Sequence, residues 1–320
     1  DEIRQTAISA GVDTCWSQWA VLGAPASTRK RANRSIIDPE ALVLLSLGMR
    51  SYERRLVDLL GWWARVGSSY LSVQRMIALA DSFPEKVRKR VGEFASLAYA
   101  AGDRRWRRFA GEINGLPKVR EKGRDEPHLT ARPALLLRLR AGFGLSIKSD
   151  LLAVLLGLCG EQATVRTLLQ ATRYTEPPFR DAARDMVLAK LIRQTSERPV
   201  RYFANPEPWM GVFQIYGISN RSPAFHDEGE ATQAPAWRFW GDVFALLCAT
   251  IFGIERLKEK ERVSPYVASS RLRDIYETHR GAFERNRIPT PDPTDFPGEL
   301  YLEAFRTTIS TTADWTRRVL

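Results

Sequence analysis

The sequence predicts a mainly helical protein of several domains, one of which ends in a short β hairpin. Hydrophobic residues make up 44% of the 320 residues, which is enough to bury a core and excludes a wholly disordered chain. Apolar residues recur at helical spacing along much of the chain, as at Leu56, Leu60 and Trp63. The runs 191–195 and 200–204 have the character of two short strands joined by a proline-containing turn.

The charge of the chain is unevenly distributed. Lys and Arg number 48 against 37 Asp and Glu, a formal net charge of +11. Residues 1–130 carry +7, residues 131–210 carry +5, and residues 211–320 carry −1. A basic surplus confined to part of a chain indicates a polyanionic partner, because summed charge attracts polyanions over roughly a Debye length.

Several classes of protein are excluded by motif. Cys15, Cys159 and Cys248 lie far apart in apolar surroundings, which argues against a disulfide framework or a cysteine zinc site and favours buried thiols. Phosphate-binding glycine motifs, paired metal ligands and a nucleophilic serine elbow are not found, so we expect no cofactor, no metal and no catalytic residues. The longest apolar run, 243–254, is too short to span a bilayer. We therefore expect a cytoplasmic protein without membrane contact, and the opening Asp1 suggests a natural chain that begins earlier.

The first third of the chain is expected to comprise an arm and a helical domain. Residues 1–36 end in a basic run at 29–34 and are interpreted as an arm or loop. Residues 37–115 look helical throughout, with Asp38 as an N-cap before Pro39. Residues 116–132 are polar and contain Gly and Pro, which is typical of a linker.

A sharper pattern occupies residues 133–210. A short apolar helix is expected at 148–158, and a second helix follows Thr164, which is expected to cap it. A third helix follows its expected N-cap, Thr175, and extends to about residue 190, with Pro177 in its first turn. The two strands come next, so the order is helix, helix, turn, helix, strand, turn, strand.

This order resembles the winged helix-turn-helix domains of bacterial ArsR- and MarR-type regulators, over about residues 148–205. The resemblance implies that the third helix enters the major groove of DNA. Arg180 would then contact a base edge and Arg184 a phosphate, while Thr175 at the helix N-terminus would donate to another phosphate. Arg198 and Arg201 in the hairpin, or wing, would follow the DNA backbone or the minor groove.

A diverged second copy of the same domain is a candidate at about residues 53–110. A shift of 92 residues overlays 71–110 on 163–202 without a gap and aligns their apolar positions. A third helix at 84–98 would bear one basic cluster, and a wing around Trp106 would bear another. The DNA-binding candidates of this copy are Lys86, Arg88, Lys89, Arg90, Arg104, Arg105, Arg107 and Arg108.

Residues 211–320 are expected to form a C-terminal helical domain. The helix at 236–260 is apolar on more than one side, which implies burial on two sides. A homodimer interface or a packed scaffold for the other domains would supply that burial.

The function expected from these features is sequence-specific binding of double-stranded DNA by a dimeric bacterial transcriptional regulator. The main alternative is a protein-interaction module, such as an antitoxin-like or defence-system subunit on a winged-helix scaffold. Glu176, Asp181 and Asp185 favour that alternative, because acidic groups repel phosphates. A third alternative is an enzyme that acts on nucleic acid.

Overall fold

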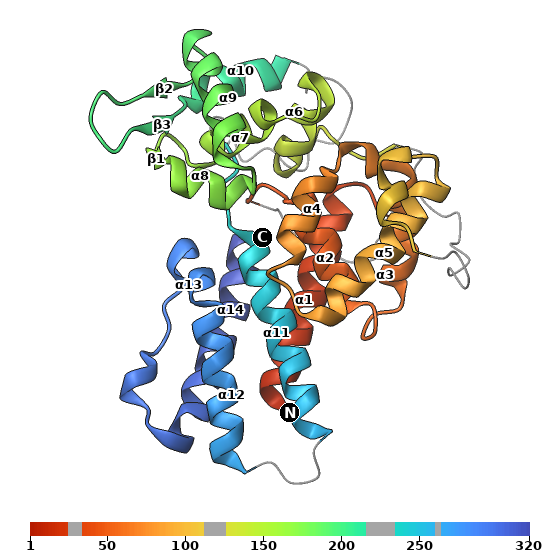
Figure 1. Ribbon diagram of the computed structural model, residues 1–320, viewed down its shortest axis with the longest axis vertical. Coiled ribbons are helices and arrows are strands. Elements are labelled where there is room, and N and C mark those ends of the chain that lie inside the picture. Colours follow the sequence, from red (N-terminus) through yellow and green to blue (C-terminus); the bar gives the residue numbers. More distant parts are fainter. Residues whose placement is uncertain (25–33, 112–125, 216–233, 260–263) are drawn as a thin grey trace, which may run out of the picture. The chain divides into compact units, whose positions relative to one another are not determined.

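The protein is mainly helical and contains a small three-stranded antiparallel sheet (Figure 1). A computed structural model describes residues 1–24, 34–111, 126–215, 234–259 and 264–320. The chain divides into two compact units. Unit 1 contains residues 1–33, 38–127 and 239–320, and unit 2 contains residues 34–37 and 128–238.

Unit 1 is built from helices. Its elements are α1 (Glu2–Val21), α2 (Pro39–Met49), α3 (Arg55–Val66), the 3-10 helix η1 (Ser68–Tyr70), α4 (Val73–Ala80), α5 (Glu85–Ala100), η2 (Arg104–Phe109), α11 (Trp240–Lys258), α12 (Pro265–Thr278), α13 (Arg280–Asn286), η4 (Pro293–Asp295), η5 (Gly298–Leu300) and α14 (Tyr301–Val319).

The core of unit 1 joins the two ends of the sequence. Helix α1 packs against α14, α11 and α2, and α11 also packs against α12 (Figure 1). Trp19 of α1 lies edge-on to Trp62 of α3, with ring centroids 6.4 Å apart, and both indoles are buried. The two-sided burial expected for α11 is thus supplied within the chain, by a packed scaffold.

Three expectations for unit 1 are wrong. Residues 2–21 form a helix of the core and are not an arm, although the basic residues 29–31 lie outside the described part of the chain. Residues 239–320 share a unit with 38–127 and do not form a domain of their own. Residues 104–109 form the 3-10 helix η2 where a strand hairpin was expected; Asp103 caps its start, and Trp106 packs against Phe94 of α5.

Between residues 147 and 203 unit 2 contains the expected helices and strands in their expected order, and it adds a short strand at 163–164 and helices at 135–143 and 206–215 that were not expected. It contains η3 (Arg132–Ala134), α6 (Leu135–Phe143), α7 (Ile147–Gly157), β1 (Ala163–Thr164), α8 (Val165–Thr172), α9 (Glu176–Leu188), β2 (Arg193–Gln194), β3 (Arg201–Phe203) and α10 (Pro206–Ile215). Residues 116–125 of the expected linker, 116–132, lie outside the described residues, and η3 begins at the last residue of that range.

The small sheet of unit 2 is ordered β1-β3-β2, with both pairs antiparallel. Thr164 lies opposite Arg201, and Gln194 lies opposite Tyr202. Tyr202 and Ile192 are buried, and β3 packs against α7. The strands are therefore held to the helices of the unit by one face of the sheet, and the hairpin between β2 and β3 extends away from those helices (Figure 1).

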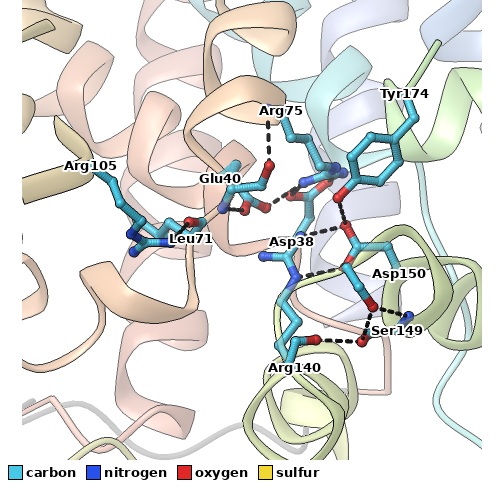
Figure 2. A network of polar contacts seen from close by, with 12 residues as sticks. Asp38, Glu40, Leu71, Arg75, Arg105, Arg140, Ser149, Asp150 and Tyr174 are labelled. Carbon is cyan, nitrogen blue, oxygen red and sulfur yellow. Dashed lines mark hydrogen bonds and ion pairs between the residues drawn. The ribbon is translucent and has the colours of Figure 1, made fainter. Parts of the chain in front are cut away.

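Each unit contains a cluster of buried charged side chains that hydrogen-bond to one another (Figure 2). In unit 1, Arg75 donates to Asp38 and Glu40 at 2.5–2.6 Å, and all three side chains are buried. In unit 2, Arg140 donates to both oxygens of Asp150 at 2.7 Å, and the Tyr174 hydroxyl donates to Asp150 at 3.0 Å. Breaking a buried pair of this kind typically costs about 3–5 kcal/mol, so these clusters fix the helices that they join.

No described helix combines the length and the apolar character that crossing a bilayer requires. Cys15 and Cys248 are buried, as expected, whereas Cys159 is exposed and corrects that expectation.

Candidate nucleic-acid interface

The β2–β3 hairpin presents its basic residues on the outward face of the sheet. Side chains alternate along a strand, so the buried Tyr202 places its neighbours Arg201 and Phe203 on the opposite face. Arg193 lies opposite Phe203 in the register and shares that face. Beyond β2 the Thr195 N–H donates to the Arg201 carbonyl at 2.9 Å, and the Arg201 N–H donates to Thr195 Oγ1 at 3.0 Å.

The hairpin arginines keep their positive charge unneutralised. Arg193, Arg198 and Arg201 are all exposed, and among the described residues none has a carboxylate within 4 Å. Lys190, which precedes the hairpin, is exposed as well. Glu197 is the acidic residue of this segment, so residues 190–201 carry a net charge of +3. Sequence reasoning did not identify Lys190 and Arg193, although the register of alternate residues around Tyr202 would have indicated Arg193.

Helix α9 presents a different surface, because its arginines are paired with acids. Arg180 Nε donates to Glu176 Oε1 at 2.7 Å, one turn away on the same helix. Arg184 forms an ion pair with Asp181, three residues earlier on the helix, with Nη2 2.9 Å from Oδ1. Both expected DNA contacts of this helix are therefore solvent-exposed but internally neutralised.

The other acid of α9 is also paired. Lys148 of α7 donates to Asp185 at 2.8 Å, and this hydrogen bond lowers the pKa of Asp185. Glu176, Asp181 and Asp185 thus all take part in ion pairs, and the exposed surface of α9 is close to neutral.

The two expected threonine caps behave differently. Thr164 Oγ1 accepts a hydrogen bond from the Thr167 N–H at 3.2 Å, which confirms it as the side-chain cap of α8. Thr175 has the extended backbone of an N-cap, but its side chain makes no capping hydrogen bond. Its exposed hydroxyl is free of the helix backbone, at the N-terminus of α9.

The basic residues expected on helix α5 of unit 1 are partly structural. Lys86 lies 3.5 Å from Glu255 and over the ring of Phe252, and Lys89 pairs with Glu85 at 2.7 Å. Arg90 donates to the Leu47 carbonyl at 2.7 Å and to Ser51 at 3.0 Å, and its burial lowers its pKa. Arg88 is exposed, and its side chain makes no hydrogen bond or ion pair with the residues that the structure describes.

The basic residues of η2 divide in the same way. Arg105 donates to the Ser68 carbonyl at 2.8 Å and to Asp103 at 2.6 Å, so it holds η2 to the segment before α4. Arg104, Arg107 and Arg108 are exposed. The sequence cluster therefore contains one arginine that stabilises the fold and three that face solvent.

Among the described residues, no group of three or more His, Cys, Asp or Glu side chains is arranged to hold a metal ion. His279 is half-buried, and burial lowers its pKa.

No family model matches the chain, and comparisons with curated proteins and with solved structures return no significant similarity. The arrangement of residues in each unit is therefore the basis on which function can be inferred.

Proposed function

We propose that unit 2 is a winged helix-turn-helix domain that binds double-stranded DNA, and that the chain is a dimeric bacterial transcriptional regulator that works in the cytoplasm. The observation that carries the proposal is the outward sheet face with its unpaired arginines Arg193 and Arg201, next to the helix pair α8 and α9. The ion pairs on α9, and the lack of carboxylates of the described residues near the hairpin arginines, indicate which part of the domain would contact DNA.

The order of elements supports the fold assignment. Helix α7, strand β1, helices α8 and α9, and the β2–β3 hairpin follow one another, with β3 between β1 and β2. In winged helix-turn-helix proteins a hairpin wing follows the recognition helix, which lies in the major groove. Here α8 would be the first helix of the motif and α9 the recognition helix.

The electrostatics favour the hairpin as the main backbone contact. Neutralising phosphates releases condensed counterions, which supplies much of the affinity for DNA. The segment 190–201 offers a net charge of +3, whereas α9 offers paired charges that must be separated before they can bind phosphate or base. Arg198 and Arg201 therefore carry more of the affinity than Arg180 and Arg184 in this proposal.

A protein-interaction role is the second candidate, and one observation favours it. Leu188 at the end of α9 is 75% exposed and Leu191 is 43% exposed. Exposed apolar side chains beside a neutral helix face suit a protein partner better than a polyanion. An antitoxin-like subunit would use this surface of the same domain.

A gel shift on random duplex DNA tests the two candidates. Replacing Arg198 and Arg201 by Ala removes two phosphate contacts and should lower the slope of log affinity against log salt by about 1.8. The matched control replaces Arg280 and Arg317, which are exposed and ion-paired in unit 1. If log affinity falls equally steeply with log salt for both double variants, the hairpin does not bind DNA, and the protein-interaction role becomes the favoured function.

A further inference from the structure

The six side chains of η2 lie in three stripes along the helix. A 3-10 helix has three residues per turn, so side chains three apart lie above one another. In the run 104–109 this places Trp106 with Phe109, Arg104 with Arg107, and Arg105 with Arg108. One apolar stripe thus lies between two arginine stripes.

The apolar stripe fixes η2 to helix α5. Trp106 is fully buried and lies edge-on to Phe94, with ring centroids 5.3 Å apart. Ser96 of α5 donates to the Gly111 carbonyl at 3.3 Å, just beyond η2. The short helix is therefore held along its length by the helix beneath it.

Arg105 fixes η2 from a second side. Its guanidinium donates to the carbonyls of Ser68 and Leu71, at 2.8 and 3.3 Å, and to Asp103. Asp103 also accepts the Arg105 N–H at 3.2 Å, which caps the start of η2. Arg105 thus stabilises the fold, and Arg104, Arg107 and Arg108 lie on a short helix that is held in place on two sides.

The three remaining arginines of η2 form no ion pair with the acidic residues that the structure describes. Arg104, Arg107 and Arg108 are exposed, and within the described part of the chain none lies within 4 Å of a carboxylate. The rise of a 3-10 helix sets Arg104 and Arg107 roughly 6 Å apart along the axis. Three like charges held so close repel one another, so a multivalent anion bound across them relieves that repulsion.

We propose that η2 is a second nucleic-acid contact of this chain, in which Arg104, Arg107 and Arg108 bind backbone phosphates. The inference rests on the proposed DNA function and adds a site on unit 1. Guanidinium groups bind phosphate through paired N–H donors, which lysine cannot offer. Stable attachment to a membrane usually adds an inserted apolar face to a basic cluster, and of the apolar stripe of η2 Trp106 is fully buried while the Phe109 ring is 36% exposed.

The test uses the intact protein and a random DNA duplex, with affinity measured by fluorescence anisotropy between about 50 and 200 mM salt. One variant replaces the three η2 arginines by Ala. The matched control removes the same charge from exposed, ion-paired arginines of unit 1, namely Arg271, Arg280 and Arg317. Unchanged urea midpoints verify that both variants fold.

We expect the η2 variant to lower the slope of log affinity against log salt by about 2.7, and the control to change it far less. Equal slopes for the two variants, in a protein whose hairpin variant R198A/R201A does lose slope, would overturn the η2 site and leave the proposed function standing. Failure of the unaltered protein to bind DNA would overturn both. Binding to phosphatidylserine vesicles that the η2 variant loses, with its DNA slope unchanged, would assign the surface to membranes and also overturn the proposal.

Discussion

Arg180 Nη2 lies 2.5 Å from Glu176 Oε1, and the two residues sit one turn apart on the exposed surface of α9. An arginine in this position contacts DNA only after it leaves its carboxylate, and the carboxylate then faces phosphate. Under the proposed DNA-binding function, the pairing would therefore reduce the part that α9 plays in binding duplex DNA and leave a larger part to the hairpin.

Removal of the Glu176 charge should strengthen binding. The substitution Glu176→Gln keeps the shape of the side chain, frees Arg180 and removes a repulsive charge, so we expect roughly threefold tighter duplex binding at low salt. Anisotropy titration measures the change. Weaker binding by this variant would contradict the placement of α9 at the DNA.

Arginines of the hairpin and of α9 should differ in their effects. Arg201→Ala removes an unpaired charge, and we expect about tenfold weaker binding at low salt, whereas Arg180→Ala removes a paired charge and should cost less than threefold. Parallel titrations of the two variants give the ratio. A larger loss of DNA affinity in Arg180→Ala than in Arg201→Ala would contradict the proposed roles of α9 and the hairpin.

The buried pair of unit 2 should be sensitive to loss of one partner (Figure 2). Asp150→Ala leaves the Arg140 guanidinium without its two 2.7 Å acceptor contacts, and we expect unfolding to become easier by about 3–5 kcal/mol. Tyr174→Phe removes one neutral donor and should cost about 1 kcal/mol. Urea denaturation followed by circular dichroism measures the unfolding free energy of both variants. The expectation is wrong if Asp150→Ala destabilises the protein less than Tyr174→Phe does.

Trp106 should determine whether η2 stays attached to α5. Trp106→Ala empties a fully buried site beside Phe94 and should destabilise unit 1 by about 3–5 kcal/mol. Trp106→Phe keeps an aromatic ring and should cost less. Hydrogen exchange of the amides of η2 provides a local readout, and unaltered protection in the Ala variant would refute the anchoring role.

Glu53 should contribute to the acid sensitivity of unit 1. Its hydrogen bonds to Arg55 lower its pKa from 4.5 to about 2. Because the folded state has the lower pKa, the stabilisation is complete above pH 4.5 and disappears as the pH falls towards 2. Arg55 is largely exposed, so we expect a contribution of about 0.2–1 kcal/mol.

The measurement is the difference in unfolding free energy between the unaltered protein and Glu53→Gln at several pH values. The difference should shrink as the pH falls from 4.5 towards 2. A difference that is constant over this range would show that ionised Glu53 does not stabilise the fold.

Local signals in the sequence predicted several helix starts and both strands of the hairpin, although α6, β1 and α10 were not expected. Thr164 was expected as a cap and has the capping hydrogen bond, and the two strands lie inside the expected runs. Asp38 was expected as an N-cap and accepts the Ala41 N–H at 3.1 Å. Such features depend on residues within a few positions of one another, which is the range over which sequence patterns are informative.

Features that depend on distant contacts were missed. The pairing of Asp38 with Arg75 joins residues 37 positions apart, and no sequence pattern indicates it. The same limit applies to Arg105, which looks like its neighbours in sequence but is used to hold η2 in place. Helix α1 was missed because its apolar residues form no single stripe, since neighbouring helices of unit 1 pack against it on several sides.

Selection of duplexes from a random pool by the intact protein, followed by sequencing, tests the central claim most directly. A dimeric winged-helix regulator should enrich a motif of two inverted half-sites with centres roughly 10 base pairs apart, and the R198A/R201A variant should retain far less of that DNA. A bound pool with the same composition as the input would contradict sequence-specific binding of DNA by this protein.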